Sequence, residues 1–246
     1  MSYIGIYKIA DHVFSLETIF DYTHKMCFDY TSEEAPEFNI TTSEEDIQYE
    51  RKKSYEEAVH EGIKPLEFAP SYLESLAVLR KFANILLERS IILFHGSSLA
   101  YNGDGYIFTA KSGTGKSTHT RFWQKTFSEK CVMINDDKPI LRIEKDGVTV
   151  FGSPWNGKHN IGNNTSAPLK VISILNRGEK NEVFKIDKNK AFGMLLQQTY
   201  RPEGIENMTR LLPLVDKLAD SVKLYNIFCN LEESTALEIF NGMKGQ

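Results

Sequence analysis

The chain has 246 residues, of which 41% are hydrophobic and 25% charged, values ordinary for a globular protein. This length suits one large domain, or a small domain joined to a medium one. The 29 basic and 33 acidic residues give a formal net charge of −4, so no overall positive field attracts nucleic acid.

The beginning of the chain and its cysteines indicate a compartment. Residues 1–6 lack the basic start and long apolar core of a secretion signal, and no apolar run approaches the ~20 residues of a membrane span. Cys27, Cys131 and Cys229 are far apart and form no Cys-x-x-Cys pair, which favours reduced thiols over disulfides or structural zinc. We therefore expect a cytoplasmic protein with neither membrane nor nucleic-acid partners.

The first fifty residues predict short strands separated by polar turns. Residues 3–9 and 38–40 alternate apolar and polar side chains, and residues 12–14 form a further short apolar segment. The acidic run at 43–46 and the basic run at 51–53 are interpreted as solvated faces rather than sites.

A helix is predicted to follow this β-rich part. Ser71 and Glu74 have the spacing of a capping box directly after Pro70, and apolar residues then recur at helical spacing as far as Leu86. We expect this helix to end a small β-rich N-terminal lobe, residues 1–88, and to lead into a second domain, residues 89–246.

The second domain opens with strands. Residues 91–94 are apolar and β-branched, which predicts a buried strand. Residues 97–101 and 106–109 flank Asn-Gly-Asp-Gly, a strong hairpin signal. The strand at 106–109 should therefore pair antiparallel with the strand before it.

That strand leads into a glycine-rich loop, Ala110-Lys-Ser-Gly-Thr-Gly-Lys-Ser-Thr118, and a helix predicted to begin near Lys116. Glycines let backbone N–H groups converge on phosphate oxygens, and the helix N-terminus adds the positive end of its dipole. Lys116 would reach the β- and γ-phosphates, and Ser117 would hold Mg²⁺. Ala110 replaces the first glycine of the usual pattern, and a glycine-rich turn without a ligand is the alternative. The predicted nucleotide-binding residues are Ser112, Gly113, Thr114, Gly115, Lys116, Ser117 and Thr118.

Carboxylates follow the next buried strand. Residues 131–135 are mostly apolar and end at Asp136 and Asp137, and an α/β sheet places its chemistry at such strand ends. Further strands are expected at 148–152, 169–175 and 222–228, and helices at 211–220 and after residue 230. The whole pattern indicates a mixed α/β protein.

The order of His95-Gly96, the glycine-rich loop and Asp136-Asp137 resembles the catalytic domain of HPr kinase/phosphatase and its small kinase relatives. The resemblance covers roughly residues 91–178. It implies the phosphoenolpyruvate carboxykinase-like P-loop fold, use of ATP and Mg²⁺, and transfer of phosphate to a hydroxyl. Some of these relatives phosphorylate free serine or serine in peptide precursors, so a hydroxyl-bearing small molecule or a peptide is the expected acceptor.

The resemblance also implies roles for individual residues. It places the acid/base group at the aspartate pair, and we assign Asp136 as the base and Asp137 to the metal environment, with the opposite division left open. It suggests that His95 orients or neutralises the transferred phosphoryl group, although a histidine satisfied inside a strand end is the structural alternative. A solvated turn is the alternative for the aspartates.

Several cations are further candidates for contacting phosphate or acceptor. Lys158 and His159 lie in the glycine-flanked loop at 152–162, Arg177 follows a strand, and Arg121 is one turn after Ser117. For each of them alone, an ordinary surface or salt-bridged role is the more common outcome. Trp155 either stacks on adenine or packs in the core.

The chain departs from HPr kinases because no late Gly-Arg-Asn segment is present, which argues against HPr as acceptor and against phosphatase activity. The alternative functions are a nucleotide-binding regulatory or peptide-carrier module, and a carboxykinase for a small keto acid. A homo-oligomer is possible because relatives form hexamers.

Overall fold

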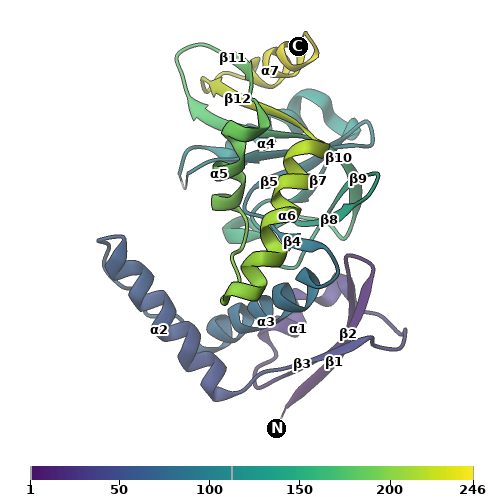
Figure 1. Cartoon of the computed structure of the whole chain (residues 1–246), viewed down its shortest axis with the longest axis vertical. Coiled ribbons are helices and arrows are strands. Elements are labelled where there is room, and N and C mark those ends of the chain that lie inside the picture. The colour runs from purple at the N-terminus through teal and green to yellow at the C-terminus, as the bar shows by residue number, and fades with distance from the viewer. Residues whose placement is uncertain (1, 112, 246) are drawn as a thin grey trace. The chain divides into compact units, whose positions relative to one another are not determined.

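The computed structural model describes residues 2–111 and 113–245, and the chain divides into two compact units, Met1–Ile85 and Leu86–Gln246. Both units combine helices and strands (Figure 1), which confirms the mixed α/β class. No helix in these ranges is long and apolar enough to cross a membrane.

The first unit contains a three-stranded sheet of order β1-β2-β3. β1 and β2 form an antiparallel hairpin, whereas β3 runs parallel to β2. The elements are β1 Tyr3–Ile9, β2 His12–Thr18, α1 Tyr22–Met26, the short 3₁₀ helix η1 Phe28–Tyr30, β3 Phe38–Thr41, α2 Glu44–His60 and α3 Pro70–Leu87.

Aromatic side chains hold the core of this unit together. Phe14 of β2 is fully buried, with its ring 5.6 Å from that of Phe38 and 4.9 Å from that of Phe82. The capping box predicted before α3 is wrong, because the helix begins at Pro70 and the Glu74 carboxylate instead accepts hydrogen bonds from the backbone of Ile19 and Phe20. Glu74 therefore fixes the turn after β2.

Helix α2 was not anticipated from the sequence. Its charged residues give it a weak apolar face, and only Ile47, Glu50 and Ala58 are buried. Arg80 of α3 donates through Nε to Glu50 at 2.6 Å, so an ion pair holds a helix that has little apolar surface to bury. The prediction failed because periodicity methods depend on apolar residues.

The second unit contains a nine-stranded sheet with the order β4-β8-β9-β10-β6-β5-β7 along its main path. β12 pairs with β10, and β11 pairs with β12. The strands are β4 Ile91–Leu93, β5 Ser97–Tyr101, β6 Asp104–Thr109, β7 Cys131–Asn135, β8 Ile140–Glu144, β9 Gly147–Phe151, β10 Ser166–Arg177, β11 Glu182–Lys185 and β12 Lys223–Cys229. The helices are α4 Lys116–Phe127, η2 Ser128–Lys130, η3 Gly157–His159, α5 Lys188–Gln198, α6 Ile205–Ser221 and α7 Thr235–Lys244.

The strand directions bring four strand ends to one edge of this sheet. β10 is parallel to both β6 and β12. β5 is antiparallel to β6, which confirms the predicted hairpin, and β7 is antiparallel to β5 and so runs with β6. The carboxyl ends of β6, β7, β10 and β12 therefore face the same side, where α/β sheets bind their ligands.

Helices cover the two faces of the sheet. Ile172 of β10 packs in a cluster with α5 and α6, whereas its neighbour Val171 packs in a cluster with α4 and α7, as the alternation of a strand requires. Pro213 lies inside α6 without ending it, so the helix is longer than predicted. Helix α5 was not predicted, yet it supplies a wall of the site.

Candidate active site

The glycine-rich loop joins β6 to α4 in the backbone conformation that a phosphate cradle needs. Gly113 has φ +76° and Gly115, the residue before α4, has φ +118°, values that L side chains rarely adopt. A Cβ on Gly115 would meet nothing within 4 Å, so the dihedral angle rather than space requires glycine there. Ser112 lies outside the described residues.

Lys116 occupies the first position of α4 and folds back over the loop. Its Nζ lies 3.3 Å from the carbonyl oxygen of Ala110, at the start of the loop. Burial lowers the pKa of Lys116, while the negative charges of Asp137 and Asp136 act in the opposite direction. A half-buried cation is thus held between the cradle and the two carboxylates.

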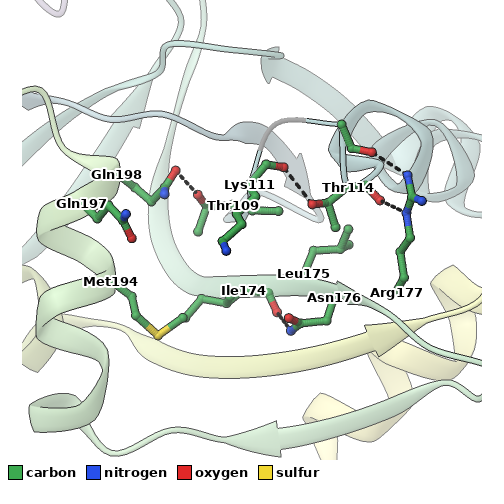
Figure 2. A pocket seen from close by; sticks show the side chains of 12 residues that line it. Thr109, Lys111, Thr114, Ile174, Leu175, Asn176, Arg177, Met194, Gln197 and Gln198 are labelled. Carbon is green, nitrogen blue, oxygen red and sulfur yellow. Dashed lines mark hydrogen bonds between the residues drawn. The ribbon is translucent and has the colours of Figure 1, made fainter. Parts of the chain in front are cut away.

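Arg177 braces the loop from the end of β10. Its guanidinium donates to the carbonyl oxygens of Gly113 at 2.7 Å and Thr114 at 3.4 Å, as Figure 2 shows. The side chain of Thr114 also donates to the carbonyl of Lys111 at 2.8 Å. Arg177 therefore contacts the predicted phosphate loop itself, and its guanidinium is directed at loop carbonyls.

His95 lies between β4 and β5, where it is fixed by the end of α5. Its Nδ1 is 3.0 Å from Oε1 of Gln198, and its backbone N–H donates to the Gln198 carbonyl at 2.7 Å. Thr109 at the end of β6 also donates to Gln198 Oε1 (Figure 2), at 3.0 Å. Because an amide oxygen only accepts, Nδ1 of His95 carries the proton and Nε2 is left for another partner.

The carboxylate of Asp137, the second residue after β7, lies on the Nε2 side of this ring. Nε2 of His95 is 3.5 Å from Asp137 Oδ1, and Lys138 Nζ is 3.4 Å from Oδ2. The Asp137 side chain is 29% exposed, so solvent or a substrate reaches it. Burial, then the positive charge of Lys116, lower the pKa of His95, whereas the charge of Asp137 raises it.

Asp136 has a different environment from its neighbour. It is 7% exposed, and its Oδ1 accepts a 2.6 Å hydrogen bond from Ser97 on β5. Ser97 also lies 3.1 Å from the hydroxyl of Thr120, one turn after Ser117 on α4. Asp136 is thus tied to the helix that carries Ser117, while Asp137 faces His95.

The loop after β9 walls this carboxylate pair. The amide of Asn135 donates to Asn156 at 2.7 Å, and the N–H of Asp136 donates to the carbonyl of Ile161 at 3.1 Å. A Cβ on Gly157 would lie 3.0 Å from the Cβ of Asp137, so this glycine allows the loop to approach closely. Neighbouring residues of the loop therefore lie near Asp137.

The remaining predicted cations are at the surface. Lys158 and His159 are exposed on η3, directly after Gly157. Arg121 is exposed and donates through Nε to the carbonyl of Ser117 at 3.2 Å. Trp155 is 5% exposed and does not line either cavity described below, which favours its packing role over stacking on adenine.

The donor set near the loop fits a Mg²⁺ ion. Ser117 and the two aspartates offer oxygen ligands, which this hard cation prefers, and Mg²⁺ commonly takes only one or two carboxylates with the phosphates supplying the rest. No group of three or more His, Cys, Asp or Glu side chains suited to a metal occurs in residues 2–111 and 113–245. A dedicated protein cage is therefore not seen in that part of the chain, and a metal–nucleotide arrangement suits these residues.

Two cavities open beside the loop. The larger, about 540 Å³, lies between the loop, the end of β10 and α5, and reaches Gln198 (Figure 2). The smaller, about 210 Å³, lies between the first turns of α4 and the ends of β10 and β12. Thr114, Leu175, Asn176 and Arg177 line both cavities.

Sequence reasoning missed two residues of this region. Gln198 holds His95, but its position at the end of an unpredicted helix gave no signal. His119 was assigned no role, although it lines the smaller cavity. His119 is three residues after Lys116, and this helical spacing could have indicated that it lies near the phosphate loop.

No family model and no curated protein matches this chain. Among solved structures it is similar to the Hpr(Ser) kinase/phosphatase from Coxiella burnetii, with 10% sequence identity and a TM-score of 0.34. The similarity covers 62% of this chain and 93% of that chain. Similarity at this level leaves the assignment of function to the residues themselves.

Proposed function

We propose that this chain is an ATP- and Mg²⁺-dependent kinase that transfers the γ-phosphoryl group to a hydroxyl, with serine in a small molecule or peptide as the expected acceptor. The observation that carries the proposal is the accessible Asp137 carboxylate beside both His95 and Lys116. A protein that only binds nucleotide needs a cradle but no such base.

The phosphates are bound by the loop and the start of α4. Backbone N–H groups from Gly113 to Thr118 and the helix dipole attract the triphosphate, and Lys116 neutralises charge at its β/γ end. When bound, Mg²⁺ neutralises further charge on the phosphates. Ser117 would hold it, with Asp136 nearby through the Ser97–Thr120 contacts.

The proton of the acceptor hydroxyl goes to Asp137. As the acceptor oxygen forms its bond to the γ-phosphorus, the bond from that phosphorus to the bridging oxygen of ADP breaks, and the carboxylate takes the proton. Nε2 of His95, 3.5 Å from Asp137, is placed to receive the proton from it. The exposure of the two aspartates thus favours Asp137 as base and Asp136 in the metal environment, the opposite of our sequence-based division.

The larger cavity is the space we assign to the acceptor. It ends at Gln198, the residue that holds His95, and it borders Lys111 and the loop. Lys158 and His159, exposed on the loop next to Asp137, are placed to meet an anionic part of the acceptor or its product.

The test is an acceptor-dependent transfer assay. Purified protein is incubated with ATP, Mg²⁺ and either free serine or serine-containing peptides, and the products are weighed by mass spectrometry. We expect one acceptor to gain a phosphoryl group with wild type but not with Lys116→Ala or Asp137→Asn, while the exposed control Lys130→Ala retains activity. ATP binding without turnover of any acceptor would instead favour a regulatory or carrier module.

A further inference from the structure

The last residue of β7 is a buried asparagine whose side chain binds the backbone that follows it. Asn135 is fully buried, and its Oδ1 accepts hydrogen bonds from the backbone N–H groups of Asp137 at 2.8 Å and Lys138 at 2.6 Å. An asparagine that binds backbone two residues later in the chain closes a turn with its own side chain. The Asn135 oxygen therefore closes the turn that carries Asp137.

The amide nitrogen of the same side chain binds the loop after β9. Nδ2 of Asn135 donates to Oδ1 of Asn156 at 2.7 Å and lies 3.0 Å from both the carbonyl oxygen and the hydroxyl of Ser153. Backbone N–H groups only donate, so the atom that faces Asp137 and Lys138 is the oxygen, and the orientation of the amide is determined by its surroundings. Asn135 thus joins the turn to the loop, which neither an apolar side chain nor a carboxylate could do.

Asp137 is held at both of its backbone polar groups. Its N–H donates to Asn135, and its carbonyl oxygen accepts from the N–H of Gly96 at 3.0 Å. Gly96 directly follows His95, whose Nε2 lies 3.5 Å from the Asp137 carboxylate. These two backbone contacts therefore fix where the carboxylate lies relative to the imidazole, and Asn135 supplies one of them.

Asp136 is anchored by other groups than the side chain of Asn135. Its N–H donates to the carbonyl of Ile161 at 3.1 Å, and its carboxylate accepts from the hydroxyl of Ser97 at 2.6 Å. The Asn135 oxygen binds the next two residues instead. Loss of this oxygen should therefore displace the proposed base, Asp137, and leave the carboxylate of the proposed metal environment in place.

We propose that Asn135 is a positioning residue for phosphoryl transfer, because its side-chain oxygen holds Asp137 where the carboxylate takes the proton of the acceptor hydroxyl. This role rests on the proposed kinase function, and Asn135 acts through Asp137 rather than on the substrates. Misplacement of a reacting group by about 1 Å can lower a rate about a hundredfold. Removal of the Asn135 amide should therefore lower kcat, whereas ATP binding, which depends on the glycine-rich loop and Lys116, should stay the same.

The experiment compares Asn135→Ala with Asn135→Ser. Alanine removes the whole amide, whereas a serine hydroxyl can accept from a backbone N–H two residues later, although more weakly than asparagine. The turnover is measured with Mg-ATP and whichever probe, free serine or a serine-containing peptide, wild type phosphorylates. We expect kcat to fall about 10–100-fold in Asn135→Ala and to be partly restored in Asn135→Ser, with the calorimetric affinity for Mg-ATP unchanged in both.

Asn163 provides a matched control. It lies in the same loop after β9, and its side chain donates to the carbonyl of Met133 on β7 at 2.8 Å, outside the turn that carries Asp137. Asn163→Ala therefore removes an asparagine that binds the same strand without touching the base. This variant should keep the kcat of wild type.

Hydrogen exchange of the wild-type protein, followed by nuclear magnetic resonance, gives an answer even if Asn135→Ala fails to fold. The amide protons of Asp137 and Lys138 should exchange slowly, because each is bound to a buried oxygen. Fast exchange of both, a wild-type kcat in Asn135→Ala, or equal losses in Asn135→Ala and Asn135→Ser would overturn the positioning role and leave the kinase proposal intact. Failure of wild type to phosphorylate any of the probes would overturn both.

Discussion

The buried His119 should make the protein less stable in mild acid, by an amount that follows from its environment. Its pKa is about 3 in the folded chain because of burial, against 6.5 for an ordinary histidine. The unfolded chain therefore binds a proton at pH values where the folded chain does not. The stability that this residue contributes is present above pH 6.5 and is lost as the pH falls toward 3.

The size of the effect between pH 7 and pH 5 is obtained from the same two pKa values. Each pH unit below the unfolded pKa costs about 1.4 kcal/mol, so the loss over this interval is about 2 kcal/mol from His119 alone. His119→Gln has no titrating ring but keeps an amide oxygen that can accept from Trp123, whose indole N–H donates to the His119 ring. The substituted protein should therefore lose about 2 kcal/mol less stability than wild type over this interval.

Urea unfolding at several pH values, followed by far-ultraviolet circular dichroism, measures this difference. Only the change with pH is compared, so a constant loss of stability from the substitution does not matter. If the free energies of unfolding of wild type and His119→Gln ran parallel from pH 7 to pH 5, His119 would titrate alike in the folded and unfolded states. The conclusion that His119 stays neutral when buried in the folded protein would then be wrong.

Three further predictions concern the loop and the carboxylates. Gly115→Ala should strain the backbone at φ +118° by about 1–3 kcal/mol and weaken Mg-ATP binding at least tenfold, which calorimetry would detect; unchanged affinity would contradict the cradle. Asp137→Asn should lower turnover by about 10²–10⁴-fold with little change in ATP affinity. Asp136→Asn should instead weaken the dependence of ATP binding on Mg²⁺. The reverse pattern would favour the sequence-based assignment, with Asp136 as base and Asp137 in the metal environment. Gln198→Leu removes a hydrogen bond that raises the pKa of His95, so the acid limb of the pH–rate profile should move to lower pH. If this limb did not move, the protonation of His95 would not control the rate.

Local signals in the sequence predicted much of the framework. The Asn-Gly-Asp-Gly turn identified the β5–β6 hairpin because that turn chemistry is specific, and the glycine-rich loop indicated where α4 begins. Helix α2 was not predicted because it has no apolar stripe, and an ion pair between Arg80 and Glu50 holds it instead. That contact joins residues thirty positions apart, so no local window contains it.

The same distinction applies to the candidate site. Loop residues are contiguous, so their spacing alone predicted them. Gln198 and His95 are separated by 103 positions, and backbone pairing between the segments that contain them, such as the bridge of Phe94 with Thr199, brings them together. The different exposures of Asp136 and Asp137 likewise depend on Ser97 and on the loop after β9. Two adjacent aspartates in a sequence do not indicate which of them will be buried.

The binding of Mg-ATP by wild type and by Lys116→Ala tests the central claim most directly. Calorimetry should show saturable binding by wild type that weakens when Mg²⁺ is removed, and a loss of at least tenfold in affinity for Lys116→Ala with an unchanged melting temperature in the absence of nucleotide. Equal affinity of the two proteins, or no binding by wild type, would contradict the assignment of this loop as the ATP site.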